Sequence, residues 1–312
     1  MHDLTYLNSY TPKNIPSEFE AYSTNSQSKV GMSGKVGILR LKLKKDYNTG
    51  RTVIREQYSR VPLMTQRAMY LEESLPEMAY LYIVSPSGGI LQGDRFRVDI
   101  TLENNTVAHV TTQGATRIYK MENDYASQIV NIKVGNNSYF EYIPDQIIPY
   151  QKSRFYQEVE LNVHDNATML YSEVVTPGRV ASGEAFEYDI CYIKTVCRNQ
   201  KGRLRFMDTV RSVPKYQNMR ELLNHLNVVG TIYLITNEVY ARDLQKEINE
   251  KLNKSDSVRT ASVGTSLLPS RQGVVVRILG EIAPDVRNII LEVVTIARKR
   301  ILNASFSGMR KA

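Results

Sequence analysis

The sequence has little cysteine and histidine and no tryptophan, and each shortage excludes a class of protein or site. Its 312 residues include two cysteines and four histidines. Two cysteines cannot form a disulfide framework or a multi-cysteine zinc site. The histidines are separated in sequence, so none forms the H-x-x-x-H pair of a helical metal site; they are His2, His109, His164 and His225. The sequence therefore gives little indication of a site for a tightly bound metal ion.

Long apolar runs are also absent. No stretch approaches the ~18 consecutive apolar residues that a transmembrane helix needs. The first residues show no basic segment followed by an apolar one, which is how a secretory leader begins. Together with the scarce cysteines, these features predict a cytoplasmic protein with no membrane partner.

The net charge of +8 is unevenly distributed. Residues 1–193 carry 19 basic and 22 acidic side chains, whereas residues 194–312 carry 21 basic and 10 acidic ones. The C-terminal part is therefore basic by 11 charges. Such an excess predicts an anionic partner, either nucleic acid or an acidic protein face, and is equally typical of an ordinary solvated surface.

Short strand-like segments dominate the first two thirds of the chain. Leu39, Leu41 and Leu43 alternate with charged residues, which is the period of a half-buried strand. Turn residues such as Asn104-Asn105 and Asp165-Asn166 separate later segments at hairpin-like spacing. We therefore predict a mainly β fold, a large antiparallel multi-strand domain that is sandwich-like or β-helix-like. The predicted strands are Tyr80–Val84, Phe96–Leu102, Val107–Thr112, Ile129–Val134, Ser138–Tyr142, Phe155–Val163, Thr168–Val175 and Phe186–Val196.

Helical periodicity is found only toward the C-terminus. It predicts two or three helices, near residues 216–226, 238–253 and 284–302. Asn237 is a suitable N-cap for the second helix, and Pro284 can start the third. Residues 1–30 are polar and are interpreted as a loosely ordered lead-in, which leaves 31–312 as a single domain. No internal repeat is evident in the sequence.

The segment SPSGGILQGDR, residues 85–95, is the most unusual one. Its glycines Gly88, Gly89 and Gly93 permit backbone conformations and close approaches that other residues resist. No Gly-Lys-Ser/Thr follows, and the G-x-G-x-x-G order is missing, so the segment is neither a P-loop nor a dinucleotide site. It is interpreted either as a tight connection between strands or as a loop that presents Asp94.

Three further clusters place charged and hydroxyl groups beside glycine or proline at strand ends, at residues 111–119, 140–149 and 176–186. Such positions carry function more often than strand interiors do. Paired carboxylates on a β scaffold are compatible with glycoside hydrolysis, although the lack of tryptophan removes the usual sugar-stacking side chain. The candidate carboxylates are Asp94, Glu141, Asp145, Glu173 and Glu184.

Taken in order, these motifs resemble the urease accessory protein UreD family, called UreH in some bacteria. The similar stretches cover most of residues 34–280. They are GKVGILRLKLKKDYNTGRT (34–52), PLMTQRAMY (62–70), SPSGGILQGDR (85–95), TTQGATRIYK (111–120), FEYIPDQIIPYQKSRF (140–155), TPGRVASGEAF (176–186) and VVVRILG (274–280). The C-terminal tail resembles the family less.

The resemblance implies a non-enzymatic scaffold that binds apo-urease together with UreF and UreG and helps GTP-dependent nickel delivery. It implies no permanently bound cofactor and only transient nickel(II). Weak oxygen ligands suit a protein that must release nickel, because imidazole and thiolate bind it strongly. The candidate path carboxylates are Asp94, Glu141, Asp145 and Glu184. The residues expected to shape loops or contact partners are Gly88, Gly89, Gly93, Arg117, Tyr119, Gly178 and Arg179.

Two other functions stay open at this point. A carbohydrate-active β enzyme would use two of the carboxylates, and turnover of aryl glycosides would reveal it. A nucleic-acid-binding protein would use the basic C-terminal region, and its binding would depend steeply on salt. The conduit interpretation instead requires a hollow interior between two docking faces.

Overall fold

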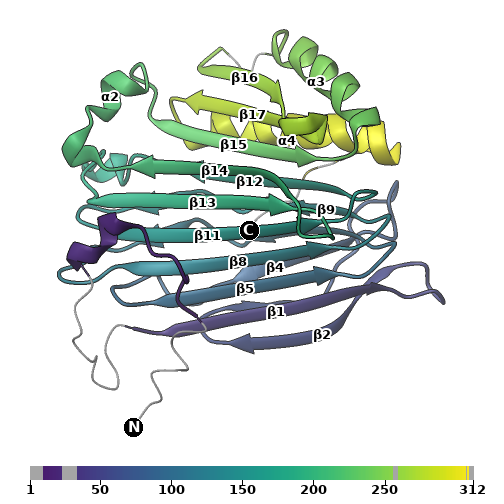
Figure 1. The fold of residues 1–312 in the computed structure, drawn as a ribbon, viewed down its shortest axis with the longest axis horizontal. Coiled ribbons are helices and arrows are strands. Elements are labelled where there is room, and N and C mark those ends of the chain that lie inside the picture. Colours follow the sequence, from purple (N-terminus) through teal and green to yellow (C-terminus); the bar gives the residue numbers. More distant parts are fainter. Residues whose placement is uncertain (1–9, 23–33, 256–258, 307, 309–312) are drawn as a thin grey trace.

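The computed structural model describes residues 10–22, 34–255, 259–306 and 308. They form two large sheets that face each other, with two helices behind one of them (Figure 1). Sheet A has seven strands in the spatial order β14 (Leu204–Ser212), β13 (Ile190–Arg198), β11 (Arg154–Val163), β8 (Ala126–Val134), β5 (Arg95–Leu102), β1 (Val36–Lys45) and β2 (Thr52–Arg60).

Sheet B has ten strands. Its main path runs through β16 (Ala261–Leu267), β17 (Gly273–Gly280), β15 (Val228–Ile235), β12 (Thr168–Val175), β9 (Tyr139–Tyr142), β6 (Val107–Thr112), β4 (Ala79–Val84) and β3 (Met64–Thr65). Two short strands lie off this path: β10 (Ile147–Pro149) pairs with β12 and with β7 (Thr116–Ile118).

The chain coils between the two sheets instead of folding back within one. From β5 to β13 the long strands alternate between sheet A and sheet B, and strands that are neighbours in a sheet pair in parallel. One turn of the coil separates Asp99 from Asn131 and His109 from Glu141 by 32 residues each. The mainly β prediction is confirmed, and its β-helix-like form describes the arrangement.

The expected antiparallel pairing of these central strands is wrong. Turns such as Asn104-Asn105 lead the chain into the opposite sheet, so they are corners of a coil and not hairpins. Antiparallel pairing is found toward the ends of the coil, in β1–β2, β13–β14, β12–β15, β15–β17 and β16–β17. A turn signal fixes where the chain bends, but it does not fix which sheet the next strand joins.

Short polar side chains stack at the corners of the coil. The Oδ1 atom of Asn104 accepts the N–H of Asn136 at 2.9 Å, and the Nδ2 of Asn166 donates to Oδ1 of Asn136 at 3.1 Å. Thr106 and Ser138 are likewise joined at 3.1 Å between their hydroxyl oxygens. The coil thus repeats in space although the sequence shows no internal repeat, because only a few positions at its corners need a short polar side chain.

The inward faces of both sheets form the main core. Leu41, Val98 and Val130 contribute from sheet A, and Val110 and Phe140 from sheet B. Part of this core is aromatic: the nearly parallel rings of Tyr142, Tyr171, Tyr233 and Phe206 follow one another with centroid distances of 5.8, 6.0 and 5.0 Å.

Two helices cover the outward face of sheet B. They are α3 (Glu238–Leu252) and α4 (Ala283–Leu302), and their buried side chains form a second core with that face. Asn237 caps α3 as predicted, since its side chain accepts the N–H of Tyr240. The other helices among the described residues are α2 (Met219–Leu222) and the short 3-10 segments η1 (Ser17–Tyr22), η2 (Val180–Ser182), η3 (Pro214–Tyr216) and η5 (Pro269–Arg271). The three predicted helices correspond to α2, α3 and α4.

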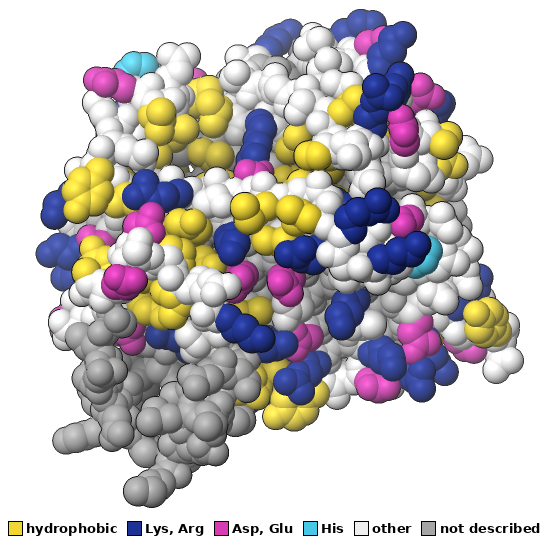
Figure 2. All heavy atoms as spheres, in the orientation of Figure 1, with side chains coloured by type: hydrophobic (Ala, Val, Ile, Leu, Met, Phe, Trp, Pro, Cys, Tyr) yellow, Lys and Arg dark blue, Asp and Glu magenta, His cyan; other side chains and the backbone are white. Residues whose placement is uncertain are grey.

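The outward face of sheet A is largely open to solvent. At one end η1 packs on it, and Phe19 is buried against Tyr125 and Tyr156. The other residues of the expected lead-in, 1–9 and 23–30, lie outside the described residues. Basic and acidic side chains are intermixed on the face shown in Figure 2. In the described part of the chain, no helix is long and apolar enough to cross a membrane.

Candidate functional site

The space between the sheets contains a cavity of about 330 Å³. The glycine-rich segment Ser85–Ile90 and the segment Thr112–Arg117 line it, together with the polar side chains Gln128 and Tyr142. These segments belong to two of the motifs singled out in the sequence. The coil therefore brings loops from separate turns together around one hollow.

A narrower hollow of about 30 Å³ lies deeper between the sheets. It shares Thr112, Thr116, Gln128 and Tyr142 with the larger cavity, so the two adjoin. Its other polar lining residues are Asp145, Gln157, Tyr171, Ser172 and Glu173. The volume suits about one water molecule or a small ion.

Glu173 is the buried carboxylate of this interior. It lies on β12 in phase with Met169, Tyr171 and Val175, which all belong to the core between the sheets. The hydroxyl of Thr195, on the facing sheet, donates to its Oε1 atom. Burial raises the pKa of Glu173 to about 7, although hydrogen bonds from Thr195 and Tyr171 act in the opposite direction. Near neutral pH this side chain can therefore gain or lose a proton.

Beyond Glu173, polar groups continue toward the surface between β14 and β17. The hydroxyl of Tyr233 donates to Oδ2 of Asp208 at 2.6 Å, and Arg277 forms an ion pair with the same oxygen. Arg277 also donates to the hydroxyl of Thr231, and 46% of its side chain is exposed. Polar side chains thus extend from the glycine-rich loop, past Glu173, to an exposed ion pair.

Asp94, a predicted path residue, is fully buried at the start of β5. Its Oδ1 atom accepts the N–H of Lys35 at 2.8 Å and that of Gly34 at 3.2 Å, and its Oδ2 atom accepts the N–H of Leu91 at 2.9 Å. Gly93 supports the same bend with a φ of +76°. In this structure the carboxylate fastens two loops together.

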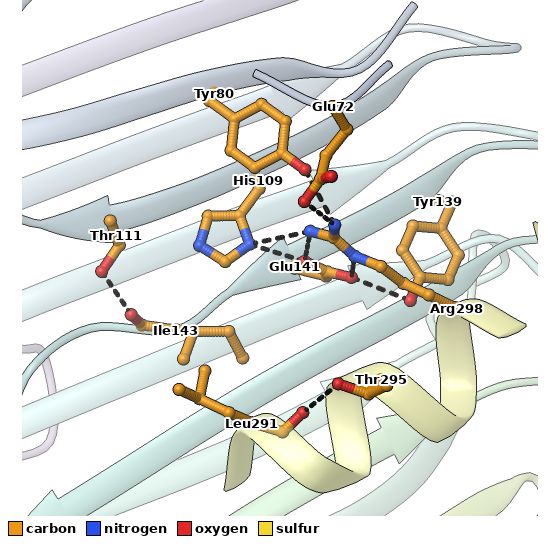
Figure 3. A network of polar contacts seen from close by, with 10 residues as sticks. All are labelled: Glu72, Tyr80, His109, Thr111, Tyr139, Glu141, Ile143, Leu291, Thr295 and Arg298. Carbon is orange, nitrogen blue, oxygen red and sulfur yellow. Dashed lines mark hydrogen bonds and ion pairs between the residues drawn. The ribbon is translucent and has the colours of Figure 1, made fainter. Parts of the chain in front are cut away.

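Glu141, a second predicted residue, points outward from β9 toward α4 (Figure 3). Its Oε1 and Oε2 atoms accept hydrogen bonds from Arg298 at 2.7 and 2.6 Å. The hydroxyl of Tyr139 donates to Oε1, and Nδ1 of His109 lies 2.5 Å from Oε2. Burial alone would raise the pKa of Glu141, but Arg298 outweighs it and lowers that pKa to about 2.

The Arg298 guanidinium completes this ionic cluster on the outward face of sheet B. The residue is fully buried in α4, and its Nη1 atom also donates to the hydroxyl of Tyr80 at 2.8 Å. Glu72 lies 3.5 Å from the same nitrogen, and the ring of Phe306 covers the guanidinium at 4.3 Å. The cluster fixes α4 to the sheet, so Glu141 serves the packing of a helix.

Glu184, a third predicted residue, pairs with its neighbour Arg179. The guanidinium donates to both carboxylate oxygens and lies over the ring of Tyr150, 4.3 Å from its centroid. Gly178, with a φ of +132°, would place a side chain 3.0 Å from the Glu184 carbonyl and 3.1 Å from that of Pro149. These residues shape a surface loop.

Tyr119 connects that loop to the glycine-rich segment. Its ring lies 5.0 Å from that of Tyr150, and a Cβ atom on Gly89 would lie 2.5 Å from the Tyr119 ring and 2.6 Å from the carbonyl of Arg117. A Cβ atom on Gly88 would likewise lie 3.1 Å from the Tyr119 hydroxyl oxygen. Of the predicted loop-shaping residues, Gly88, Gly89 and Arg117 therefore line the cavity, and Tyr119 packs against the two glycines.

Asp145, the fourth predicted residue, lines the narrower hollow together with Glu173. Its N–H donates to the hydroxyl of Thr112 at 2.8 Å, and Arg287 of α4 lies 3.9 Å from its carboxylate. It is the predicted path residue that lines the interior hollow, and it also lines a second hollow between sheet B and α4.

Sequence patterns alone did not assign Glu173, Asp208 or Arg298 to the site. Glu173 was considered only as a possible glycosidase carboxylate, although a charged residue within the apolar run of β12 is itself a signal. Asp208 and Arg277 have no such signal, because charged residues are ordinary on exposed strands. The partnership of Arg298 with Glu141 spans 157 residues and cannot be read from local spacing.

Comparison with known proteins agrees with the earlier resemblance. A family model described as UreD urease accessory protein matches residues 35–311. A urease accessory protein UreD of Cenarchaeum symbiosum is 43% identical over 284 residues, which is 90% of this chain and 98% of that protein. A urease accessory protein UreD 2 of Brucella suis is 36% identical, over 89% of this chain and 92% of its own. The UreD of Photorhabdus laumondii is 32% identical, over 88% and 85%. The resemblance is thereby confirmed, and this chain belongs to the UreD family of urease accessory proteins.

Proposed function

We propose that this protein is a non-enzymatic scaffold of urease maturation that binds apo-urease with UreF and UreG. We also propose that nickel(II) passes through its interior during GTP-dependent delivery. The observation that carries the second part is the polar hollow between the sheets, with Glu173 at its narrow part. Family membership supports the accessory role.

The chemistry of the lining suits a transported cation. Apart from Arg117 in the larger cavity, the polar side chains that line the two hollows described above offer oxygen or amide groups, and the carboxylates are Asp145 and Glu173. Oxygen donors hold nickel more weakly than imidazole or thiolate do, so the ion can leave again. Conduction requires binding that admits an ion without trapping it.

The structure also changes which carboxylates we propose for the path. Asp94, Glu141 and Glu184 are each engaged by backbone N–H groups or by an arginine, and these contacts hold loops or a helix in place. Their removal would disturb the fold before it disturbed transport. We therefore propose Glu173 as the main path carboxylate and Asp145 as the second.

The glycosidase alternative receives little support from the same geometry. General acid and base must face one cleft that admits the sugar and a water. Of the five carboxylates considered, Asp145 and Glu173 line a common hollow, and its volume of about 30 Å³ is close to that of one water molecule. The intermixed charges in Figure 2 likewise give no continuous basic track for nucleic acid on that face.

The test is nickel loading of urease co-expressed with Glu173→Gln and with the other maturation proteins. Gln keeps the shape of the side chain and removes its charge. We expect complexes to assemble normally while the nickel content of purified urease falls at least about tenfold, because a neutral amide is a much weaker ligand for a hard or borderline cation. Glu160→Gln, on the exposed face of sheet A, is the matched control. Full nickel loading with Glu173→Gln would refute the conduit, and loss of complex assembly would show that Glu173 acts through the fold.

A further inference from the structure

In the described part of the chain, the main strand paths of the two sheets end in four edge strands, and three of them are protected against pairing with another chain. β3 has only two residues. β2 carries Arg55 and Glu56, and β14 carries Asp208 and Arg211. Charged side chains and short length are the usual means by which natural edge strands avoid further pairing. The fourth edge, β16, is different.

β16 has neither charge nor proline along its seven residues, Ala-Ser-Val-Gly-Thr-Ser-Leu. It is the outermost strand of sheet B, paired with β17, and α3 packs behind it (Figure 1). Within the described part of the chain, no strand pairs with its other side. Ser262, Gly264 and Ser266 face away from the helices and are exposed.

The hydrogen bonds to β17 show which backbone groups of β16 are open. The N–H of Leu268 donates to Gly273, and the carbonyl of Thr260 accepts from Glu281. Because the direction alternates along an antiparallel strand, the even-numbered residues of β16 face β17. The N–H and C=O groups on the open side therefore belong to Ala261, Val263, Thr265 and Leu267.

Read backwards, the sequence of β16 places side chains of compatible size and character opposite one another. About a centre at Gly264, serine is opposite serine, valine is opposite threonine, and alanine is opposite leucine. In a two-fold antiparallel pair, residue i of one chain meets residue j of the other and j meets i, so both halves of the strand must fit each other. We propose that β16 is a self-association edge on which a second copy of this chain adds its own β16 in antiparallel orientation, with the two-fold axis at Gly264.

This register determines which residues of the two chains pair. Val263 and the partner's Thr265 become a hydrogen-bonded pair, so the open backbone groups are satisfied on both sides. The two Gly264 residues become a non-hydrogen-bonded pair, whose Cα atoms lie about 4.5 Å apart. Gly264 has open space where a Cβ atom would be and a backbone that other residues can adopt. Substitutions there leave the monomer intact and act on the pairing.

The charge of the protein predicts how this contact responds to salt. β16 itself places no like charges opposite each other, but each copy carries a net charge of +8. Long-range repulsion between two cationic molecules is screened as ionic strength rises. Self-association through β16 should therefore strengthen with salt, whereas binding of an acidic partner would weaken.

Sedimentation of the full chain from about 1 to about 200 µM tests the proposal, since a contact of one strand pair belongs to the weak class of interfaces. We expect a reversible dimer whose Kd falls as salt is raised. Gly264→Lys should raise that Kd about tenfold or more, because two ammonium groups would meet at the axis. Gly114→Lys, also at a glycine with open space around it, is the control and should leave the Kd unchanged. A monomer at every concentration, or a dimer that Gly264→Lys does not weaken, would overturn the proposal.

Disulfide capture tests the register independently. Gly264→Cys should form a covalent dimer under mild oxidation, because its two Cα atoms would lie within disulfide range. Ser266→Cys should not, since position 266 is opposite the partner's Ser262 and far from its own counterpart. The native Cys191 and Cys197 are buried and do not compete. Equal capture of both variants, or of neither, would contradict the proposed pairing.

Discussion

Two buried glutamates on opposite faces of sheet B have opposite electrostatics. Glu141 points outward from β9 into the contact with α4, where Arg298 and Tyr139 donate hydrogen bonds to it. Glu173 points inward from β12 into the hollow between the sheets, where Thr195 donates to it. The pKa of Glu141 is about 2, and that of Glu173 is about 7.

The difference shows that burial by itself does not decide the charge of a carboxylate. Both side chains lose their hydration, which raises the pKa of a carboxyl group. In the outward position an arginine in direct contact outweighs that cost, and the carboxylate stays ionised. In the inward position, hydrogen bonds from hydroxyl groups compensate only part of the cost of burial, so the pKa of Glu173 stays raised. The outward cluster is therefore a fixed element of the fold, whereas the inward carboxylate can exchange a proton near neutral pH.

The largest effect is expected from removing the cation of the outward pair. Arg298→Met leaves Glu141 buried without its main partner and should lower the free energy of unfolding by about 3–5 kcal/mol. Urea denaturation would measure it. Adding Glu141→Gln to the same variant should recover part of the loss, because the unpaired charge is then absent. A loss below about 1 kcal/mol would mean that the cluster behaves as an exposed pair.

The second prediction concerns pH and Glu173. An unfolded glutamate titrates near pH 4.5, so between pH 4.5 and 7 the native state holds a proton that the unfolded state has released. Stability therefore falls as pH rises through this window, by up to about 3 kcal/mol. Glu173→Gln cannot ionise, so its stability relative to the wild type should increase by about that amount between pH 4.5 and 8.

Glu141→Gln serves as the control for this titration. The pKa of Glu141 is about 2, so its stabilising ionisation is already complete above pH 4.5 and is lost only as pH falls below that value. The stability difference between Glu141→Gln and the wild type should stay constant from pH 5 to 8. If the stability difference between Glu173→Gln and the wild type were also constant from pH 5 to 8, the two carboxylates would not differ in their titration as we propose.

A smaller effect is expected from the hydroxyl that faces Glu173. Thr195→Val removes a hydrogen bond to the carboxylate and should lower the free energy of unfolding by about 1–2 kcal/mol. It should also raise the pKa of Glu173, because that hydrogen bond favours the ionised form. The pH range over which stability falls would then extend to higher pH than in the wild type. Thr209→Val, on the exposed side of β14, should do neither.

The smallest effect is expected at the third glutamate, Glu184. Its partner Arg179 is 43% exposed, so water already solvates the pair. Arg179→Gln should change the urea midpoint by no more than the error of the measurement. A loss comparable to that of Arg298→Met would show that loop shape, and not burial of charge, dominates in this protein.

Local signals in the sequence predicted the individual elements well. The Asn237 cap, Pro284 and the apolar spacing gave the positions of α3 and α4, because capping and amphipathic periodicity act within a few residues. The alternation of Leu39, Leu41 and Leu43 likewise predicted β1. The pairing of the strands was mispredicted, because parallel neighbours such as β5 and β8 are a whole turn of the coil apart.

The candidate site was predicted only in part, for the same reason. The glycine-rich and TTQGATR segments were recognised, and they line the cavity together. Of the four proposed carboxylates, Asp145 lies at the interior, while the contacts of Asp94, Glu141 and Glu184 are those of residues that hold the fold. Whether a strand residue points inward or outward follows from the pairing of the sheets, which the sequence did not reveal.

By itself, the sequence determined the family, the mainly β character and the C-terminal helices, because each depends on motifs or periodicities within a short stretch of the chain. Only the tertiary structure decided that Arg298 meets Glu141 across 157 residues and that Glu173 stands in the hollow. The charge of a buried group depends on what surrounds it in space, and those neighbours come from distant parts of the chain.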